Sequence, residues 1–180
     1  GGSLPKPGIE GPGQPLNAAC ALVCAKLLGV DISAEGAGRA IAGASLPGRF
    51  QVIEGSPTVV LDVAHNAEAA EHLAGAFRHR FPGRGALLVC AMFSDKRHVE
   101  FARALRPVAS RAFLAPTSGP RALSAEALAE RFREGGISEV STFPSVRTAL
   151  DAALSEACDD EVILVCGSFV TVGEALRALE

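Results

Sequence analysis

Apolar runs and amphipathic segments alternate along the chain from Phe50 onward. The runs 50–54 (FQVIE) and 58–64 (TVVLDVA) are separated by Gly-Ser-Pro, which is typical of a β-hairpin. Residues 67–81 then place apolar side chains at helical spacing. The run 86–93 (ALLVCAMF) is unbroken, as expected for a strand that is covered on both faces.

The same alternation continues to the end of the chain. The further predicted strands are 110–117, 139–144 and 161–169, and the further predicted helices are 98–109, 124–136, 145–157 and 170–180. Ser124 and Ser145 stand at N-cap positions. The pattern predicts an α/β fold, a Rossmann-like, mostly parallel sheet of about six strands with an N-terminal β-hairpin and helices on both faces. In such sheets ligands bind beyond the carboxyl ends of the strands.

The first part of the chain has a different pattern. Residues 1–15 are rich in Gly and Pro and predict a loop, of which Gly1–Ser3 could be a cloning remnant. The segment 16–29 (LNAACALVCAKLLG) predicts a buried helix that ends at Gly29, and a short helix is predicted over 34–43. This helical pair has few neighbours in the sequence and resembles the tail of a larger structure.

Composition narrows the class of protein. The 180 residues are 48% hydrophobic and lack Trp and Tyr, so the core must be mainly aliphatic. The net charge of −3 argues against a nucleic-acid-binding surface. No apolar run is long enough to span a membrane, and the Gly/Pro-rich start predicts no signal peptide.

The five cysteines predict reduced thiols rather than disulfides. Cys90 and Cys166 lie in predicted strands, where free cysteine behaves as a small hydrophobic residue. Cys20 and Cys24 are spaced four residues apart on a predicted helix, but no partners with zinc spacing accompany them. We therefore expect core thiols, no metal site and a reducing, cytoplasmic compartment.

Three polar residues follow the second predicted strand. Asn66 is a good N-cap, and a helix start with its free N–H groups suits an anion. His65 can add a donor, and Asp62 can accept from ribose hydroxyls, as acidic residues do in Rossmann-type sites. Alternatively, Asn66 only caps the helix, Asp62 only binds local N–H groups, and His65 has no role.

Other strand ends carry further candidates. Ser168 either caps the last helix or offers its hydroxyl and N–H to a carboxylate, and Val170 excludes a G-x-S-x-G nucleophile motif. Asp95, Lys96 and Arg121 also follow predicted strands, where they either contact a ligand or are simply solvated charges.

Phosphate-binding loops are absent from the sequence. It contains neither G-x-x-x-x-G-K-[ST] nor a G-x-G-x-x-G that follows a strand. A site that borders a nucleotide without holding its phosphates implies that another domain holds them.

Several motifs together resemble a known family. They are PLNAACALVCAKLLGVDIS, LPGRFQ, LDVAHN, SDK, GPRA and VCGSFVTV, in this order. From about Pro15 to Leu179 the chain resembles the C-terminal region of folylpolyglutamate synthase/dihydrofolate synthase, a member of the Mur ligase superfamily. The resemblance implies that residues 1–45 are the tail of a central ATPase domain with a linker, and that residues 46–180 are a Mur-ligase-type C-terminal domain.

The resemblance also implies an activity. The family ligates L-glutamate to dihydropteroate or folate through an acyl phosphate, using ATP and Mg²⁺. The Mg²⁺ ligands and the phosphate loop are expected in the missing N-terminal domain, so the fragment alone should be inactive. Residues 1–43, separated from that domain, should expose apolar surface. The parent protein is expected to be a monomer that binds neither nucleic acid nor membrane.

Site roles follow residue by residue from the resemblance. Asn17 and Arg49 would touch ATP, and Asp62 would bind the nucleotide, through its ribose. His65 would be the catalytic residue near the phosphates and the incoming glutamate, and Ser168 would help to hold the glutamate. The remaining polar residues after the predicted strands are candidate contacts: Asn66, Asp95, Lys96 and Arg121.

The sequence departs from the family at three positions. Ala67 replaces a usual Pro, Arg97 replaces an acid in the D-K-D motif, and Ala91 replaces a common Gly. Two other functions remain open, another Mur-type amino-acid ligase and a non-catalytic Rossmann-like binding module. The choice between one glutamate and many also remains open.

Overall fold

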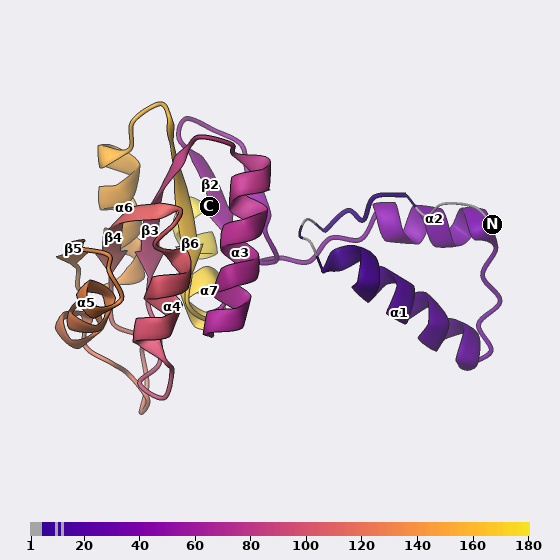
Figure 1. Ribbon diagram of the computed structural model, residues 1–180, viewed down its shortest axis with the longest axis horizontal. Helices are drawn as coiled ribbons and strands as arrows, with labels where there is room; N and C mark the ends of the chain where they lie inside the picture. The colour runs from indigo at the N-terminus through magenta and orange to yellow at the C-terminus, as the bar shows by residue number, and fades with distance from the viewer. Residues whose placement is uncertain (1–4, 10, 12) are drawn as a thin grey trace.

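The computed structural model describes residues 5–9, 11 and 13–180, and it consists of two parts. A pair of helices, α1 (Gln14–Leu27) and α2 (Ala34–Ala42), projects from an α/β domain that contains all the other elements (Figure 1). In the described part of the chain, no helix is long and apolar enough to cross a membrane.

The domain is built on one six-stranded sheet, which confirms the predicted fold class. Its strands are β1 (Gln51–Ile53), β2 (Thr58–Leu61), β3 (Gly85–Cys90), β4 (Ala109–Leu114), β5 (Glu139–Thr142) and β6 (Glu161–Cys166). The spatial order is β1-β2-β6-β3-β4-β5. Among the described strands, only the β1–β2 hairpin is antiparallel, and every other pair is parallel. The last strand in the sequence is therefore inserted between β2 and β3.

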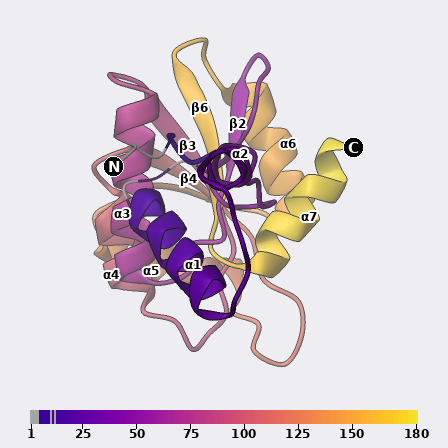
Figure 2. The same ribbon diagram turned by 90° about the vertical axis from the view of Figure 1, so that its right-hand side faces the viewer.

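Five helices cover the two faces of the sheet (Figure 2). They are α3 (Ala67–Arg80), α4 (His98–Leu105), α5 (Ala125–Glu134), α6 (Val146–Glu156) and α7 (Phe169–Leu179). Residues of α3, α4 and α5 form one buried cluster with one face of the sheet. Residues of α6 and α7 form a second cluster with the other face. The predicted caps Ser124 and Ser145 both accept from the backbone N–H three residues on.

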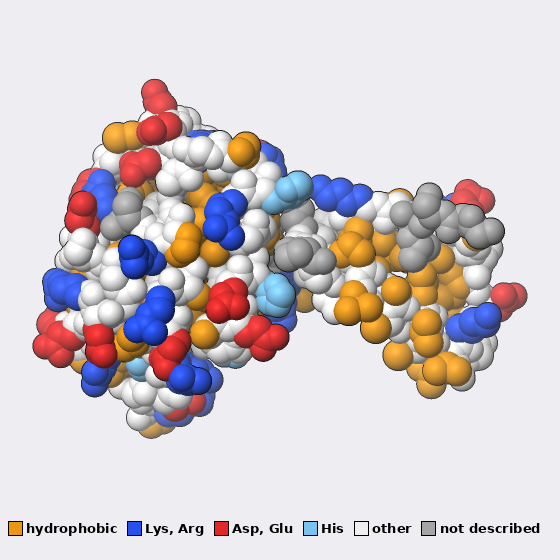
Figure 3. All heavy atoms as spheres, viewed as in Figure 1, with side chains coloured by type: hydrophobic (Ala, Val, Ile, Leu, Met, Phe, Trp, Pro, Cys, Tyr) orange, Lys and Arg blue, Asp and Glu red, His pale blue; other side chains and the backbone are white. Residues whose placement is uncertain are grey.

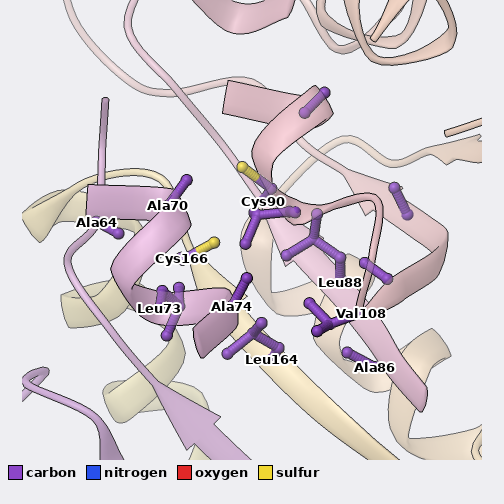
Figure 4. Close-up of a cluster of buried hydrophobic side chains, with 14 of the residues drawn as sticks. Ala64, Ala70, Leu73, Ala74, Ala86, Leu88, Cys90, Val108, Leu164 and Cys166 are labelled. Atoms are coloured by element: carbon purple, nitrogen blue, oxygen red, sulfur yellow. The ribbon is translucent and has the colours of Figure 1, made fainter. Parts of the chain in front are cut away.

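The core is mainly aliphatic, as the composition predicts, with a few Phe side chains added. Cys90 and Cys166 are fully buried partners on the neighbouring strands β3 and β6, among aliphatic residues such as Leu164 (Figure 4). Burial raises the pKa of the Cys166 thiol well above its usual value, so this thiol stays protonated. The prediction of core thiols is confirmed for these two residues.

The helical pair shows where the sequence interpretation was wrong. No residue of α1 is buried, and both Cys20 and Cys24 are exposed, as is Cys158 in the α/β domain. Thus α1 is not a buried helix in this chain, and these three thiols are not core thiols. Gly29 does end α1, with a positive φ of 77°.

Apolar side chains gather on the outside of the pair, as expected for a segment separated from a neighbouring domain (Figure 3). Leu27 and Leu28 are each 82% exposed. The other large exposed apolar residues of this part of the chain are Leu16, Val23, Val30 and Ile32. A surface of this kind is typical of an interface.

Candidate functional site

The strand order brings three carboxyl ends together. Beyond β2, the Asp62 N–H donates to Val165 O at 2.9 Å, and the Gly167 N–H donates to Ala64 O at 2.8 Å. The loop after β2 and the end of β6 therefore run side by side. On the other side of β6, Cys90 of β3 is the partner of Cys166. The candidate residues that follow β2, β6 and β3 thus share one edge of the sheet, which we call the rim.

Asn17, Arg49 and Asp62 line one pocket of about 280 Å³ between α1, α3 and the segment 43–50 that joins α2 to β1, which we call the linker. These are the three residues that the resemblance assigns to ATP. The pocket is also lined by Gly11, Gly13, Gln14, Phe50, Ala69, His72, Leu73 and Ala76. The structure therefore brings the predicted nucleotide residues together from segments far apart in the sequence.

Asp62 fastens the linker to the sheet. Its Oδ2 accepts from the Phe50 N–H at 2.9 Å, and its Oδ1 accepts from the Ala64 N–H at 2.8 Å. Burial raises the pKa of Asp62, although these two N–H groups and the charge of Arg49 act in the opposite direction. The local hydrogen bonds considered as the alternative to ribose binding are thus present, and each oxygen keeps acceptor capacity beyond them.

The linker turns sharply where it meets the rim. Phe50 has a positive φ of 45°, which is uncommon outside Gly, and its side chain is buried. Gly48 has φ of 71°, and a Cβ there would lie 2.9 Å from Val172 and 3.0 Å from Val63. The Gly48 carbonyl accepts from the Val63 N–H at 2.8 Å. These contacts hold the backbone on both sides of Arg49, whose exposed side chain lies at the pocket.

His65 has a defined tautomer. Its Nδ1 lies 2.9 Å from the Val63 carbonyl oxygen, which can only accept, so Nδ1 carries a hydrogen and donates. In the neutral imidazole, Nε2 is then the nitrogen that accepts. The ring lies 6.4 Å from the Phe169 ring, centroid to centroid. His65 therefore stands next to the start of α7.

Ser168 caps α7, and it is 95% buried, since 5% of its surface is exposed. Its Oγ accepts from the Thr171 N–H at 3.0 Å and lies 2.7 Å from Thr171 Oγ1. Gly167 before it has φ of 119°, and a Cβ there would come within 2.4 Å of Ala91 O. Close approach of β6 to the end of β3 thus requires Gly at this position.

Three of the remaining candidates, Asp95, Lys96 and Arg121, form a separate charged group. Asp95 pairs with Lys96 at 3.4 Å and with Arg121 at 3.7 Å. The guanidinium of Arg121 also lies 4.6 Å from the centre of the Phe93 ring. Asn66 caps α3 through the Ala69 N–H at 2.8 Å. In the structure each of these side chains therefore contacts another of them or the backbone.

Four residues next to the site were not identified as candidates from the sequence: Phe50, His72, Phe169 and Thr171. Phe50 and Thr171 act through backbone and hydroxyl geometry that no spacing rule detects. His72 lay unmarked in the predicted helix 67–81, and Phe169 was placed at the end of the predicted strand 161–169, whereas it is the first residue of α7. Only the strand order brings these two residues to the pocket and the rim. Among the described residues, no group of three or more His, Cys, Asp or Glu could hold a metal ion.

Comparison with known proteins gives the class. Residues 48–169 match the family described as Mur ligase, glutamate ligase domain, so the chain belongs to that family. The matched range contains every candidate site residue except Asn17: Arg49, Asp62, His65, Asn66, Asp95, Lys96, Arg121 and Ser168.

Within that family the chain is homologous to the C-terminal part of dihydrofolate synthase/folylpolyglutamate synthase. It is 38% identical to the Escherichia coli K12 enzyme over 99% of this chain and 40% of that protein. The Mycobacterium tuberculosis enzyme is 35% identical over 74% of this chain and 30% of that protein. The chain thus spans less than half of the length of these relatives.

Solved structures agree. Escherichia coli FolC in complex with DHPP and ADP superposes with a TM-score of 0.87 at 38% identity, over 98% of this chain and 40% of that one. Mycobacterium tuberculosis folylpolyglutamate synthase complexed with ADP gives 0.84 at 30% identity, over 97% of this chain and 41% of that one. A further bifunctional synthase, with a TM-score of 0.85 and 35% identity over 98% of this chain and 41% of that one, was solved with Mn, AMPPNP and L-glutamate bound.

Proposed function

We propose that this chain is the C-terminal part of an ATP-dependent ligase that joins L-glutamate to dihydropteroate or folate. The observation that carries the proposal is that α1, the linker and one edge of the sheet bring five candidate residues into one region. Asn17, Arg49 and Asp62 line one pocket, while His65 and Ser168 lie at the neighbouring strand ends. A binding module without catalysis would not need both groups.

The proposed reaction has two steps. A carboxylate oxygen of the pterin substrate attacks the γ-phosphorus of ATP, giving an acyl phosphate and ADP. The glutamate amine then attacks the acyl carbon, the bond from that carbon to the phosphate oxygen breaks, and inorganic phosphate leaves as the amine loses a proton. Catalysis of this kind depends on bringing three substrates together and on neutralising phosphate charge.

The nucleotide side of the site is assigned to the pocket. Arg49 offers an exposed guanidinium, which suits phosphate oxygens, and Asn17 offers its side-chain amide. The acceptor capacity that remains on Asp62 suits a ribose hydroxyl. Mg²⁺, which has no cluster of candidate ligands among the described residues, would be held by the part of the parent protein outside this chain.

The glutamate side of the site is assigned to His65 and Ser168. Because Nδ1 of His65 donates to Val63, Nε2 of the neutral ring can accept the proton that the amine loses. Ser168 lies at the start of α7, where the first N–H groups have no partner within the helix and suit a carboxylate. Asn66, Asp95, Lys96 and Arg121 remain secondary candidates for rim contacts.

The exposed apolar face of α1 and α2 is assigned to contact with the ATPase domain of the parent protein. With that domain absent, nothing in this chain would hold the phosphates. We therefore expect this chain alone to bind ATP weakly and to ligate nothing.

The test is steady-state kinetics on the full-length parent protein with dihydropteroate and with tetrahydrofolate as acceptors. Asp62→Ala should raise the KM for ATP, and His65→Ala should mainly slow glutamate addition. Glu126→Ala, on the exposed surface of α5, is the control and should change neither. Ligation of another amino acid or another acid would instead assign the chain to a different Mur-type ligase. Absence of any ATP-dependent ligation would overturn the proposal.

A further inference from the structure

A buried chain of hydroxyl groups joins the start of α7 to the end of β3. Thr171 is fully buried, and its Oγ1 donates to Ala91 O at 2.7 Å. Ser168 Oγ lies 2.7 Å from the same Thr171 oxygen and accepts from the Thr171 N–H at 3.0 Å. The two side chains therefore form one unit that spans β6, α7 and β3.

The positions of the hydrogens follow from counting donors. A carbonyl oxygen only accepts, so the single hydroxyl hydrogen of Thr171 is used on Ala91 O. In the contact between Ser168 and Thr171, Ser168 must then be the donor. Ser168 has no hydrogen left for a substrate. Of its two lone pairs, one accepts from the Thr171 N–H, and one remains.

We infer that Thr171 is a positioning residue that makes Ser168 a hydrogen-bond acceptor for the amine of glutamate, rather than a donor to its carboxylate. This inference rests on the proposed function. A carboxylate presents only acceptors, so Ser168 Oγ has nothing to offer it. An amine presents N–H groups, and the remaining lone pair of Ser168 can take one of them.

Different groups of the site then contact the amine and the carboxylates of glutamate. Ser168 Oγ and His65 Nε2 are both acceptors, so together they can hold the two hydrogens of a neutral amine and leave its lone pair for attack. The carboxylates of glutamate must then bind elsewhere, at N–H groups or cations. Thr171 touches no substrate in this arrangement and acts only through Ser168.

The first experiment compares Thr171→Val and Thr171→Ser in the full-length ligase. Valine keeps the shape and removes the hydroxyl, which frees Ser168 to rotate, so kcat/KM for L-glutamate should fall about tenfold. Serine restores the hydroxyl and should recover most of that loss. The KM for ATP should stay within about twofold, since the hydroxyl chain does not line the nucleotide pocket. Thr58→Val is the matched control, because Thr58 is also buried and donates to a carbonyl, Gly55 O, at the far end of β2.

The second experiment asks whether Ser168 contacts the amine or a carboxylate of glutamate. It uses glutarate, which keeps both carboxylates of glutamate and lacks the amine. Its inhibition constant against L-glutamate should be the same for the wild type, Ser168→Ala and Thr171→Val. If these variants bind glutarate more weakly than the wild type does, by the same factor as for glutamate, Ser168 binds a carboxylate and the inference is wrong.

A double-variant cycle separates positioning from simple loss of stability. Thr171→Val should have little further effect on kcat/KM for glutamate when Ser168 is already Ala, because it acts through that hydroxyl. Equal effects in both backgrounds would mean that Thr171 acts through the fold in general. If Thr171→Val does not fold, Thr171→Ala and the glutarate comparison with Ser168→Ala decide the matter. Failure of the wild type to ligate glutamate would refute the proposed function itself.

Discussion

Removing the Asp62 carboxylate should detach the linker from the sheet. Both oxygens of this side chain accept backbone N–H groups, one from Phe50 in the linker and one from Ala64 after β2. Asn at position 62 can accept through one atom only, and its NH₂ group would face the other N–H. Ala can accept neither. The two substitutions therefore remove one and two of these hydrogen bonds.

The loss in free energy of unfolding on substituting Asp62 is the sum of two opposing contributions. A buried N–H left without a partner costs about 1–3 kcal/mol. Burial raises the pKa of the Asp62 carboxylate, which means that burial disfavours its ionised form. A neutral side chain at position 62 does not carry this cost, which offsets part of the loss. We expect Asp62→Asn to lower the free energy of unfolding by about 1–2 kcal/mol and Asp62→Ala by about 2–3 kcal/mol.

The contribution of Asp62 to stability decreases as the pH rises. The pKa of Asp62 in the folded chain is raised from its ordinary value of 3.8, so the folded state holds this proton more tightly than the unfolded state. Its contribution to stability is complete below pH 3.8 and is lost as the pH rises through the folded pKa. The Asn side chain of the Asp62→Asn variant does not titrate, so the variant lacks this pH-dependent contribution. The difference in stability between wild type and Asp62→Asn should therefore narrow as the pH rises from about 4.

The assay is urea unfolding of this chain, combined with amide hydrogen exchange at Phe50. In Asp62→Ala the Phe50 N–H should exchange faster, since its acceptor is gone, whereas amides of the central strand β6 should change only with global stability. Asp151→Asn, on the exposed surface of α6, is the matched control and should change stability by less than about 0.5 kcal/mol. The reasoning is refuted if Asp62→Ala resembles this control and Phe50 exchange is unchanged.

Three further predictions concern the same chain. Gly167→Ala should cost about 3 kcal/mol or more in urea unfolding, because its Cβ would lie 2.4 Å from Ala91 O. Ala67→Pro should be neutral or stabilise by up to about 1 kcal/mol, since Ala67 is the first residue of α3 and Asn66 before it is extended; a loss above about 1 kcal/mol would contradict this. A thiol reagent should modify three cysteines in the native chain and five only after unfolding; a fourth fast thiol would contradict the described burial. The three reactive residues are Cys20, Cys24 and Cys158.

The order of strands and helices could be predicted because each element carries its own local signal. Unbroken apolar runs mark β3 and β6, and Ser or Asn before an amphipathic run marks the start of α3, α5 and α6. The exposure of α1 could not be predicted from its own residues, because an apolar, Ala-rich helix has the same pattern whether or not another surface covers it. In this chain no residue of α1 is buried.

The site could be predicted only as a set of residues. Asp62, His65 and Ser168 could be identified because polar residues that follow apolar strands stand out in a sequence. Their hydrogen-bond partners did not stand out. Phe50 lies 12 residues before Asp62, and its contact depends on a turn of the linker. Thr171 lies three residues after Ser168, and its contact depends on the carbonyl of Ala91, just after β3. Such contacts exist only once the sheet has assembled.

The central claim is that this chain holds half of a glutamate ligase site. The most direct measurement is mass spectrometry of the products formed from ATP, L-glutamate and dihydropteroate or tetrahydrofolate, by the full-length parent protein and by this chain at equal concentration. We predict one new glutamyl adduct per ADP released with the full-length protein, and no adduct with this chain. An adduct formed by this chain alone, or no adduct from the full-length protein with either acceptor, would contradict the account.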